Sequence, residues 1–259
     1  MEAHAGMVAS QGMLTQLPYC GAAPLPGAVL TRFNLDPLLM AALLLLLLLL
    51  LRLAPSASAR RYGTCGWGIS LVAFVSPLCA LSVALFAARI AQHMLLILAA
   101  APLIALALPG GGERHGRPRL WSACSAFFIA LWFWHMPAPY DATFASGAYY
   151  WAMHVTLFGS AIWLWREILQ SERAHAIDVL CAGAFTSMHM GLLGAVLTMA
   201  GRPLYFWHLT TTQPWGFSPL EDQQLGGVLM WVPGIALFLW AALRTFGRLR
   251  IALEEPGAP

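Results

Sequence analysis

The sequence contains little charge. Only 10% of its 259 residues are Asp, Glu, Lys or Arg, against about a quarter in a typical soluble domain, while 59% are hydrophobic. Lysine is missing altogether, so all 14 basic residues are arginine, and no basic patch with interleaved aromatic residues suggests nucleic-acid binding. The composition therefore excludes an ordinary soluble domain and a nucleic-acid-binding one, and it indicates an integral membrane protein.

The sequence also lacks the short motifs of catalysis and of cysteine chemistry. It has no G-x-S-x-G turn, no H-E-x-x-H motif and no phosphate-binding loop, so we predict that the protein is not an enzyme. Its five cysteines include no C-x-x-C pair, which excludes a zinc ribbon and a thioredoxin-type motif. Cys20 and Cys79 are expected on the outer side of the membrane. Two interpretations stay open for them, a disulfide and a pair of free thiols.

Long apolar runs are abundant. Seven of them approach the roughly 20 residues that are needed to cross a hydrocarbon core, at 36–53, 66–83, 84–108, 119–136, 149–169, 178–200 and 223–244. Between the second and third runs, Ser76-Pro77 interrupts an almost continuous apolar stretch and marks a short turn. We therefore predict an all-α integral membrane protein, a seven-transmembrane helix bundle.

The placement of arginine predicts the orientation of this bundle, because cytoplasmic loops carry an excess of positive charge. The connections after the first, third, fifth and seventh runs are basic, and the others hold only Arg32 and Arg202. This alternation predicts an extracytoplasmic N-terminal tail at 1–33, the transmembrane domain at 34–246 and a cytoplasmic C-terminal tail at 247–259. The outward loops are then those at about 77–83, 137–148 and 201–222.

Histidines stand out inside the apolar runs, where ionisable groups usually face the interior of the bundle, a cavity or each other. In the predicted topology five of the eight histidines lie in the outer half, at mid-membrane or outside: His93, His135, His154, His189 and His208. Methionines accompany them, as Met94 follows His93. A histidine or methionine in a bundle is often a packing residue, and that interpretation stays open.

The alternative interpretation is a metal site. Imidazole with thioether suits copper better than magnesium or calcium, which prefer oxygen, and better than structural zinc, which usually takes thiolate. Asp141 and Asp222, both predicted at the outer surface, are candidates for a carboxylate ligand or for an acceptor that fixes a histidine tautomer. The candidate metal residues are therefore His93, Met94, His135, Asp141, His154, His189 and Asp222.

Two further polar stretches have structural explanations. Arg89 lies four residues before His93 on the same helical face, and we expect it to extend to the outer surface or to pair with Asp141 or Asp222. In the segment 218–234, Glu221 and Asp222 are typical of a helix N-terminus, where acidic residues complement the helix dipole. Ser218-Pro219 is the expected cap of this helix. Gly226-Gly227 allows another helix to approach closely, and the glutamines before it can hydrogen-bond across that contact.

The order of several motifs resembles one known family, the CtaG-type cytochrome c oxidase assembly factors linked to caa-type oxidases. The resemblance covers nearly all of residues 19–240 and is carried by YCG at 19–21, NLDP at 34–37, LFAARIAQHMLL at 85–96, WHMPAPYD at 134–141, MHMGLLGAVLT at 188–198, RPLY at 202–205 and SPLEDQQLGGVLMWVPG at 218–234. Any one of these motifs alone would be weak, but their succession is specific.

The resemblance implies a seven-span protein of the bacterial cytoplasmic (inner) membrane that helps to assemble a haem-copper oxidase. It implies copper bound transiently and delivered to the catalytic subunit of the oxidase, and it leaves room for a periplasmic copper chaperone as a further partner. Two alternatives stay open. One is a haem-binding membrane oxidoreductase subunit with ligands such as His93 and His154, and the other is a copper transporter, for which polar residues in the inner halves of the helices are scarce.

Overall fold

A computed structural model describes residues 17–109, 117–170 and 176–254. These residues form helices and no strand, as predicted for an all-α protein. The long helices are α2 (Pro37–Leu53), α3 (Ala57–Val75), α7 (Arg117–Trp134), α9 (Gly147–Gln170), α10 (Ala176–Met199) and α11 (Pro219–Glu254). One further rod is continuous but composite, and consists of α5 (Phe86–Met94), the π-helix η2 (Leu95–Ala100) and α6 (Ala101–Ala107).

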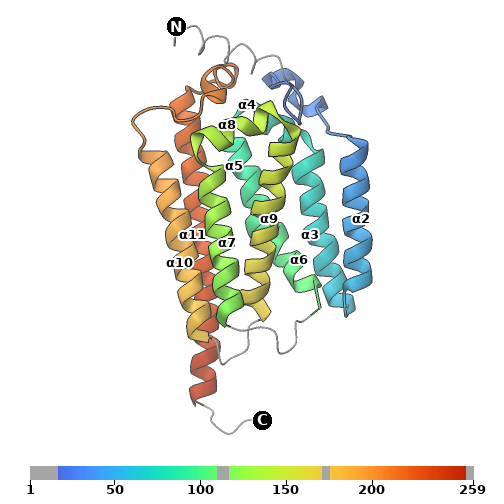
Figure 1. The fold of residues 1–259 in the computed structure, drawn as a ribbon, viewed down its shortest axis with the longest axis vertical. Helices are drawn as coiled ribbons and strands as arrows, with labels where there is room; N and C mark the ends of the chain where they lie inside the picture. The colour runs from blue at the N-terminus through green and yellow to red at the C-terminus, as the bar shows by residue number, and fades with distance from the viewer. Residues whose placement is uncertain (1–16, 110–116, 171–175, 255–259) are drawn as a thin grey trace.

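The long helices and the composite rod stand upright, side by side (Figure 1). The short elements gather at one end of the bundle: η1 (Pro26–Thr31), α4 (Pro77–Ala84), α8 (Pro137–Ala145) and the connection 200–217. We call these four segments the roof. The predicted loops at 77–83 and 137–148 are therefore largely the short helices α4 and α8.

Only some of the described helices meet the length and composition expected of a membrane span. Within the described ranges, Phe86–Ala107 and Ile177–Met199 are long and apolar enough to cross a membrane, and α3 with α4 adds a third if this pair, bent by 50°, is one span. The apolar α2 is shorter than that criterion. Crossing by all seven rods, and the predicted orientation, therefore remain predictions.

Several predicted boundaries are shifted. The second span was predicted at 66–83, but α3 begins at Ala57 and ends at Val75, because the side chain of Ser76 accepts a hydrogen bond from the Leu78 backbone N–H (3.2 Å) and starts α4. The last helix begins at Pro219 and continues to Glu254, beyond the predicted end at 244. Its start is capped as predicted, because Ser218 and Glu221 each accept a hydrogen bond from the other's backbone N–H.

The π-helix in the composite rod follows from a proline. Pro102 has no N–H to donate, so a carbonyl in the turn before it lacks its helical partner. The Ile97 carbonyl, five residues earlier, accepts a hydrogen bond from the indole N–H of Trp165 in α9 (2.8 Å). The irregular turn starts directly after Met94, and such turns often lie at functional sites.

Glycines bring α11 against its neighbours, as predicted. A Cβ atom at Gly226 would overlap the ring of Phe86 in α5, and one at Gly227 would overlap Thr198 and the Gly194 carbonyl in α10. Substitution of either glycine would therefore push helices apart. These contacts fix the start of α5, and with it the height of His93 in the bundle.

A disulfide joins Cys20 to Cys79 in α4, which resolves the choice that the sequence left open. The sulfur atoms lie 3.5 and 3.7 Å from the hydroxyl of Tyr150 near the start of α9. Tyr19 stacks on the Tyr150 ring with 4.8 Å between the ring centroids. The disulfide thereby holds the segment that leads into η1 against α4 and α9.

Candidate functional site

Three of the predicted histidines converge just inside the roof. The ring of His93 lies 5.7 Å from that of His135 and 5.4 Å from that of His154, measured between centroids, and both pairs are edge to face. His93 and His154 each lie seven residues after the start of their helices, about 10 Å along the axis at 1.5 Å per residue. His135 directly follows the end of α7. All three side chains are buried, and we call them the histidine triad.

Hydrogen bonds to backbone carbonyls define the tautomers of His135 and His154, the two residues that flank His93 in the triad. Nδ1 of His135 lies 2.6 Å from the Leu131 carbonyl, and Nδ1 of His154 lies 2.9 Å from the Tyr150 carbonyl. A carbonyl oxygen only accepts hydrogen bonds, so each Nδ1 must carry the proton and donate it. In the neutral ring, Nε2 then keeps its lone pair, which is the arrangement that suits a metal ligand.

The remaining nitrogens of the triad have no hydrogen-bond partner among the described residues. They are Nδ1 and Nε2 of His93, Nε2 of His135 and Nε2 of His154. Buried polar atoms are nearly always paired, because an unpaired one costs about 1–3 kcal/mol. A concentration of such atoms at one point indicates a ligand or a proton that the side chains alone do not supply.

The surroundings of the triad are apolar. A narrow gap, too small to hold a water molecule, is lined by His93, Leu96, Ile97, His154, Leu157 and Phe158. Met94 is buried in the main hydrophobic cluster. Within residues 17–109, 117–170 and 176–254, no group of three or more His, Cys, Asp or Glu side chains has the geometry to hold a metal ion as it stands.

Arg89 lies one helical turn from His93, on the roof side, and it does not reach the surface as expected. Its side chain is 1% exposed. Nη1 donates to the Thr143 hydroxyl (2.6 Å), and the guanidinium carbon lies 4.0 Å from the centroid of the Phe144 ring. No acid in the described residues pairs with it, so the expected ion pair with Asp141 or Asp222 is also wrong.

The two carboxylates that were predicted near the site accept hydrogen bonds from backbone N–H groups instead. Asp222 is completely buried and accepts from the N–H groups of Phe86 (2.6 Å) and Ala87 (3.1 Å), which caps α5. Asp141 in α8 accepts from the N–H groups of Phe206 (3.1 Å) and Trp207 (3.2 Å). Burial raises the pKa of Asp141, and these two hydrogen bonds oppose the rise.

The roof contains a hydrogen-bonded layer that the sequence did not identify as a unit. Nε2 of His208 lies 2.8 Å from the Tyr140 hydroxyl, and its Nδ1 lies 3.2 Å from the Thr211 hydroxyl. The Tyr205 hydroxyl donates to the His135 carbonyl (2.8 Å). Burial, reinforced by the charge of Arg89, lowers the pKa of His208 to about 3. The signal that could have found this layer was the series of aromatic residues at 204–217.

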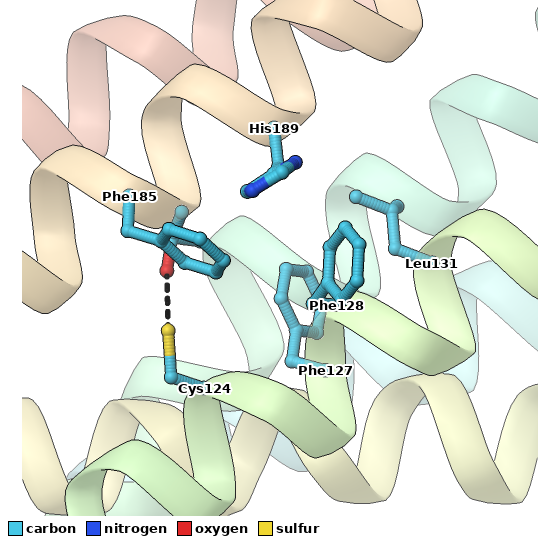
Figure 2. A pocket seen from close by; sticks show the side chains of 7 residues that line it. Cys124, Phe127, Phe128, Leu131, Phe185 and His189 are labelled. Atoms are coloured by element: carbon cyan, nitrogen blue, oxygen red, sulfur yellow. Dashed lines mark hydrogen bonds between the residues drawn. The ribbon is translucent and has the colours of Figure 1, made fainter.

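His189 lies away from the triad, on the seam between α7 and α10 (Figure 2). Its ring centroid is 4.4 Å from that of Phe128 and 4.1 Å from that of Phe185. Cys124 lies in the same pocket and contacts the Thr186 hydroxyl at 3.5 Å. Aromatic rings therefore surround His189, and its buried Nδ1 also has no hydrogen-bond partner among the described residues. Its ring contacts are with Phe128, Trp132 and Phe185, and none is with a member of the triad.

Of the seven candidate residues, the structure thus brings together His93, His135 and His154. Met94 neighbours His93 in sequence but its side chain packs into the hydrophobic cluster. Asp141 and Asp222 are engaged with backbone N–H groups. Arg89 is the residue whose position sequence reasoning misjudged most.

Comparison with protein families agrees with the resemblance seen in the sequence. The model of one family, described as the cytochrome c oxidase caa3 assembly factor, matches residues 42–250, which is well over half of the chain. The matched range includes the triad, Arg89 and the roof helices α4 and α8. It begins after the YCG and NLDP segments. Neither the curated proteins nor the solved structures gave a match.

Proposed function

The chain belongs to the cytochrome c oxidase caa3 assembly factor family, and from this premise we propose that it carries copper on the histidine triad and passes it to the oxidase. A family of assembly factors indicates a non-catalytic role and a cytochrome oxidase as partner. The observation that carries the copper proposal is the meeting of three buried histidines whose free nitrogens have no other partner among the described residues.

Two ring separations in the triad support the proposal of a shared ion, although the three side chains do not hold a metal ion as they stand. Since a bond between a metal ion and an imidazole nitrogen is about 2 Å long, the centroids of two rings that share an ion lie roughly 5–6 Å apart. The separations of 5.4 and 5.7 Å from His93 to its neighbours fall in this range. Copper binding would require the rings to reorient, because the side chains do not hold a metal ion as they stand. Imidazole donors without a carboxylate suit copper better than magnesium or calcium.

The three imidazole ligands suit copper that is carried and released better than copper that is bound permanently. Three neutral imidazoles give weaker and more exchangeable binding than a set of thiolates, as transfer requires. Copper is therefore the cargo, and the catalytic subunit of a haem-copper oxidase is the acceptor. A periplasmic copper chaperone is the donor that such a site would need.

We also propose that all seven rods cross the bacterial inner membrane, with the roof on the periplasmic side. The end opposite the roof carries Arg52 at the end of α2, Arg60 and Arg61 at the start of α3, Arg166 in α9 and Arg244 in α11. Positive charge marks the cytoplasmic side. The disulfide between Cys20 and Cys79 belongs to an oxidising compartment, which supports the same orientation.

The two alternative functions have less support. The space beside His93 and His154 has no room for even a water-sized sphere, so it does not accommodate a haem. A transporter would need polar groups that continue from the triad toward the opposite end. The next residues in that direction are Leu96, Ile97, Leu157 and Phe158.

A matched pair of histidine substitutions tests the proposal. We expect His93→Leu to abolish tight Cu(I) binding by the detergent-purified protein, measured by anaerobic competition with a chromophoric chelator, because His93 is the common neighbour of the other two. His189→Leu, on the α7–α10 seam, should bind as the unsubstituted protein does. In the host, the oxidase should lose copper with the first variant and keep it with the second.

Equal copper binding by both variants would contradict the triad as the site. A loss with His189→Leu alone would move the site to the α7–α10 seam. A purified protein that takes up no copper at all, in a folded state and with all histidines present, would overturn the cargo role itself.

A further inference from the structure

Arg89 places a full positive charge in the interior of the bundle, where burying a charge costs free energy. It is 1% exposed, and arginine stays protonated in proteins. Its Nη1 donates to the Thr143 hydroxyl, while its Nε has no hydrogen-bond partner among the described residues. A buried cation without a carboxylate is rare inside a membrane bundle and usually has a function there.

No described acid close to this end of the bundle forms an ion pair with Arg89, although Asp141 attracts it electrostatically from a greater distance. Asp222 caps α5 and Asp141 fastens the connection 200–217, each through two backbone N–H groups. Aromatic rings surround the guanidinium instead, at 4.0 Å for Phe144, 5.5 Å for Tyr140 and 5.7 Å for Tyr150. These rings attract a cation but carry no net charge. The positive charge therefore acts on whatever lies next to it.

The triad lies next to it. Four residues separate Arg89 from His93, which is a rise of about 6 Å on the same face of one helix. The Tyr150 ring bridges to the second histidine, since its centroid is 5.7 Å from the guanidinium carbon and 4.3 Å from the centroid of His154. Thr143 and Phe144 hold the guanidinium on the roof side of the triad.

We propose that Arg89 makes the histidine triad select Cu(I) over Cu(II). The inference rests on the proposed copper function and specifies the form of the cargo. A fixed positive charge in an apolar setting repels a doubly charged ion about twice as strongly as a singly charged one. The three imidazoles are neutral donors and no carboxylate joins them, so nothing in the triad offsets this difference. Cu(II) also favours tetragonal sites with four or more donors, whereas the triad supplies three.

Arg89→Gln removes the charge and Arg89→Lys keeps it, so the two variants form a matched pair. The affinities of the detergent-purified full chain for Cu(I) and for Cu(II) are measured separately, each by competition with a chelator of known affinity. We expect the Cu(I)-to-Cu(II) affinity ratio to fall about tenfold or more in Arg89→Gln. In Arg89→Lys the ratio should stay within about threefold of that of the unsubstituted protein.

An unchanged ratio in a folded Arg89→Gln protein would overturn the selection by Arg89 and leave the copper function intact. If the unsubstituted protein binds neither ion, the proposed function itself fails. Should both variants misfold, the midpoint potential of copper on the unsubstituted protein decides. A value above that of copper bound by free imidazole in solution supports the selection of Cu(I), and a value at or below it contradicts the selection.

Discussion

The roof and the histidine triad are neighbouring layers of the same protein, and they differ in whether their buried polar side chains are hydrogen-bonded. In the roof, Asp141 and His208 are buried or partly buried but hydrogen-bonded at each functional atom that the structure describes. In the triad, four imidazole nitrogens are buried with no such partner. Hydrogen bonds offset the cost of desolvation at these two roof residues, whereas nothing offsets it at the four triad nitrogens; within the roof, the buried Thr212 hydroxyl also has no partner among the described residues.

This difference separates polar residues that stabilise the fold from those that are available for chemistry. Residue type does not distinguish them, because His208 and His93 are both buried histidines on the same side of the bundle. For these two residues, the number of hydrogen-bonded ring nitrogens does, because both nitrogens of His208 have a partner and neither nitrogen of His93 has one. Substitutions in the roof should therefore lower stability and spare copper binding, and substitutions in the triad should do the reverse.

The largest effect on stability is expected from the disulfide that ties the N-terminal segment to the roof helix α4. The disulfide closes a loop with a sequence separation of 59 residues, and a loop of this size is worth about 4 kcal/mol in the chain-entropy description. Replacing Cys20 and Cys79 by serine together should lower the melting temperature in detergent but leave Cu(I) affinity unchanged. The exposed thiols Cys65 and Cys181, replaced in the same way, are the control. Equal melting temperatures for the two double variants would contradict the structural role of the disulfide.

Asp222→Ala should have the next largest effect. It leaves the buried N–H groups of Phe86 and Ala87 without an acceptor, at a cost of about 3 kcal/mol. Asp222→Asn keeps one acceptor oxygen and should lose about half as much, as thermal unfolding would measure. Cu(I) affinity should be unchanged in both. If copper binding is lost while the protein stays folded, Asp222 is a ligand after all and a site of three histidines alone is wrong.

Acidification should weaken the roof through His208. Burial lowers the pKa of His208 to about 3 in the folded protein, whereas an unfolded histidine titrates near 6.5. The unfolded state therefore binds more protons between these values, and stability falls as the pH drops below about 6.5, by about 2 kcal/mol at pH 5. The triad adds a pH dependence of its own, so the quantity to compare is the change in unfolding between pH 7 and pH 5 for His208→Gln and the unsubstituted protein. A steeper or equal change in the variant would refute this role of His208.

The smallest effect on stability, and one of opposite sign, is expected from His93→Leu. The substitution removes two buried nitrogens that have no hydrogen-bond partner and leaves an apolar group of similar size. Stability in the absence of copper should stay the same or rise by up to about 1 kcal/mol, even though copper binding is lost. A clear loss of stability in the metal-free protein would mean that His93 is a structural residue, like those of the roof.

Much of this arrangement could be predicted from the sequence. Apolar runs and the Ser76-Pro77 break indicated the helices, and the glycine pair 226–227 indicated the close contact with its neighbours. The convergence of His93, His135 and His154 followed from the expected directions of three helices.

The rest depends on contacts between residues far apart in the sequence. Asp222 and Asp141 were predicted near a metal because an acid at a helix end has the same composition whether it binds an ion or a backbone N–H. Only the placement of Phe86 and Phe206 beside them shows which it is. Arg89 was expected at the surface because its aromatic surroundings come from α8 and α9. His189 was grouped with the triad because sequence gives its depth in the bundle but not the seam that it faces.

The most direct test of the three-histidine copper site is X-ray absorption at the copper K-edge on the Cu(I)-loaded, purified protein. We predict three imidazole nitrogens about 2 Å from the copper and no sulfur, with one imidazole lost and the site weakened in His135→Leu or His154→Leu. A spectrum with sulfur bound to copper, from Met94 or a free cysteine, or with a single imidazole, would contradict it.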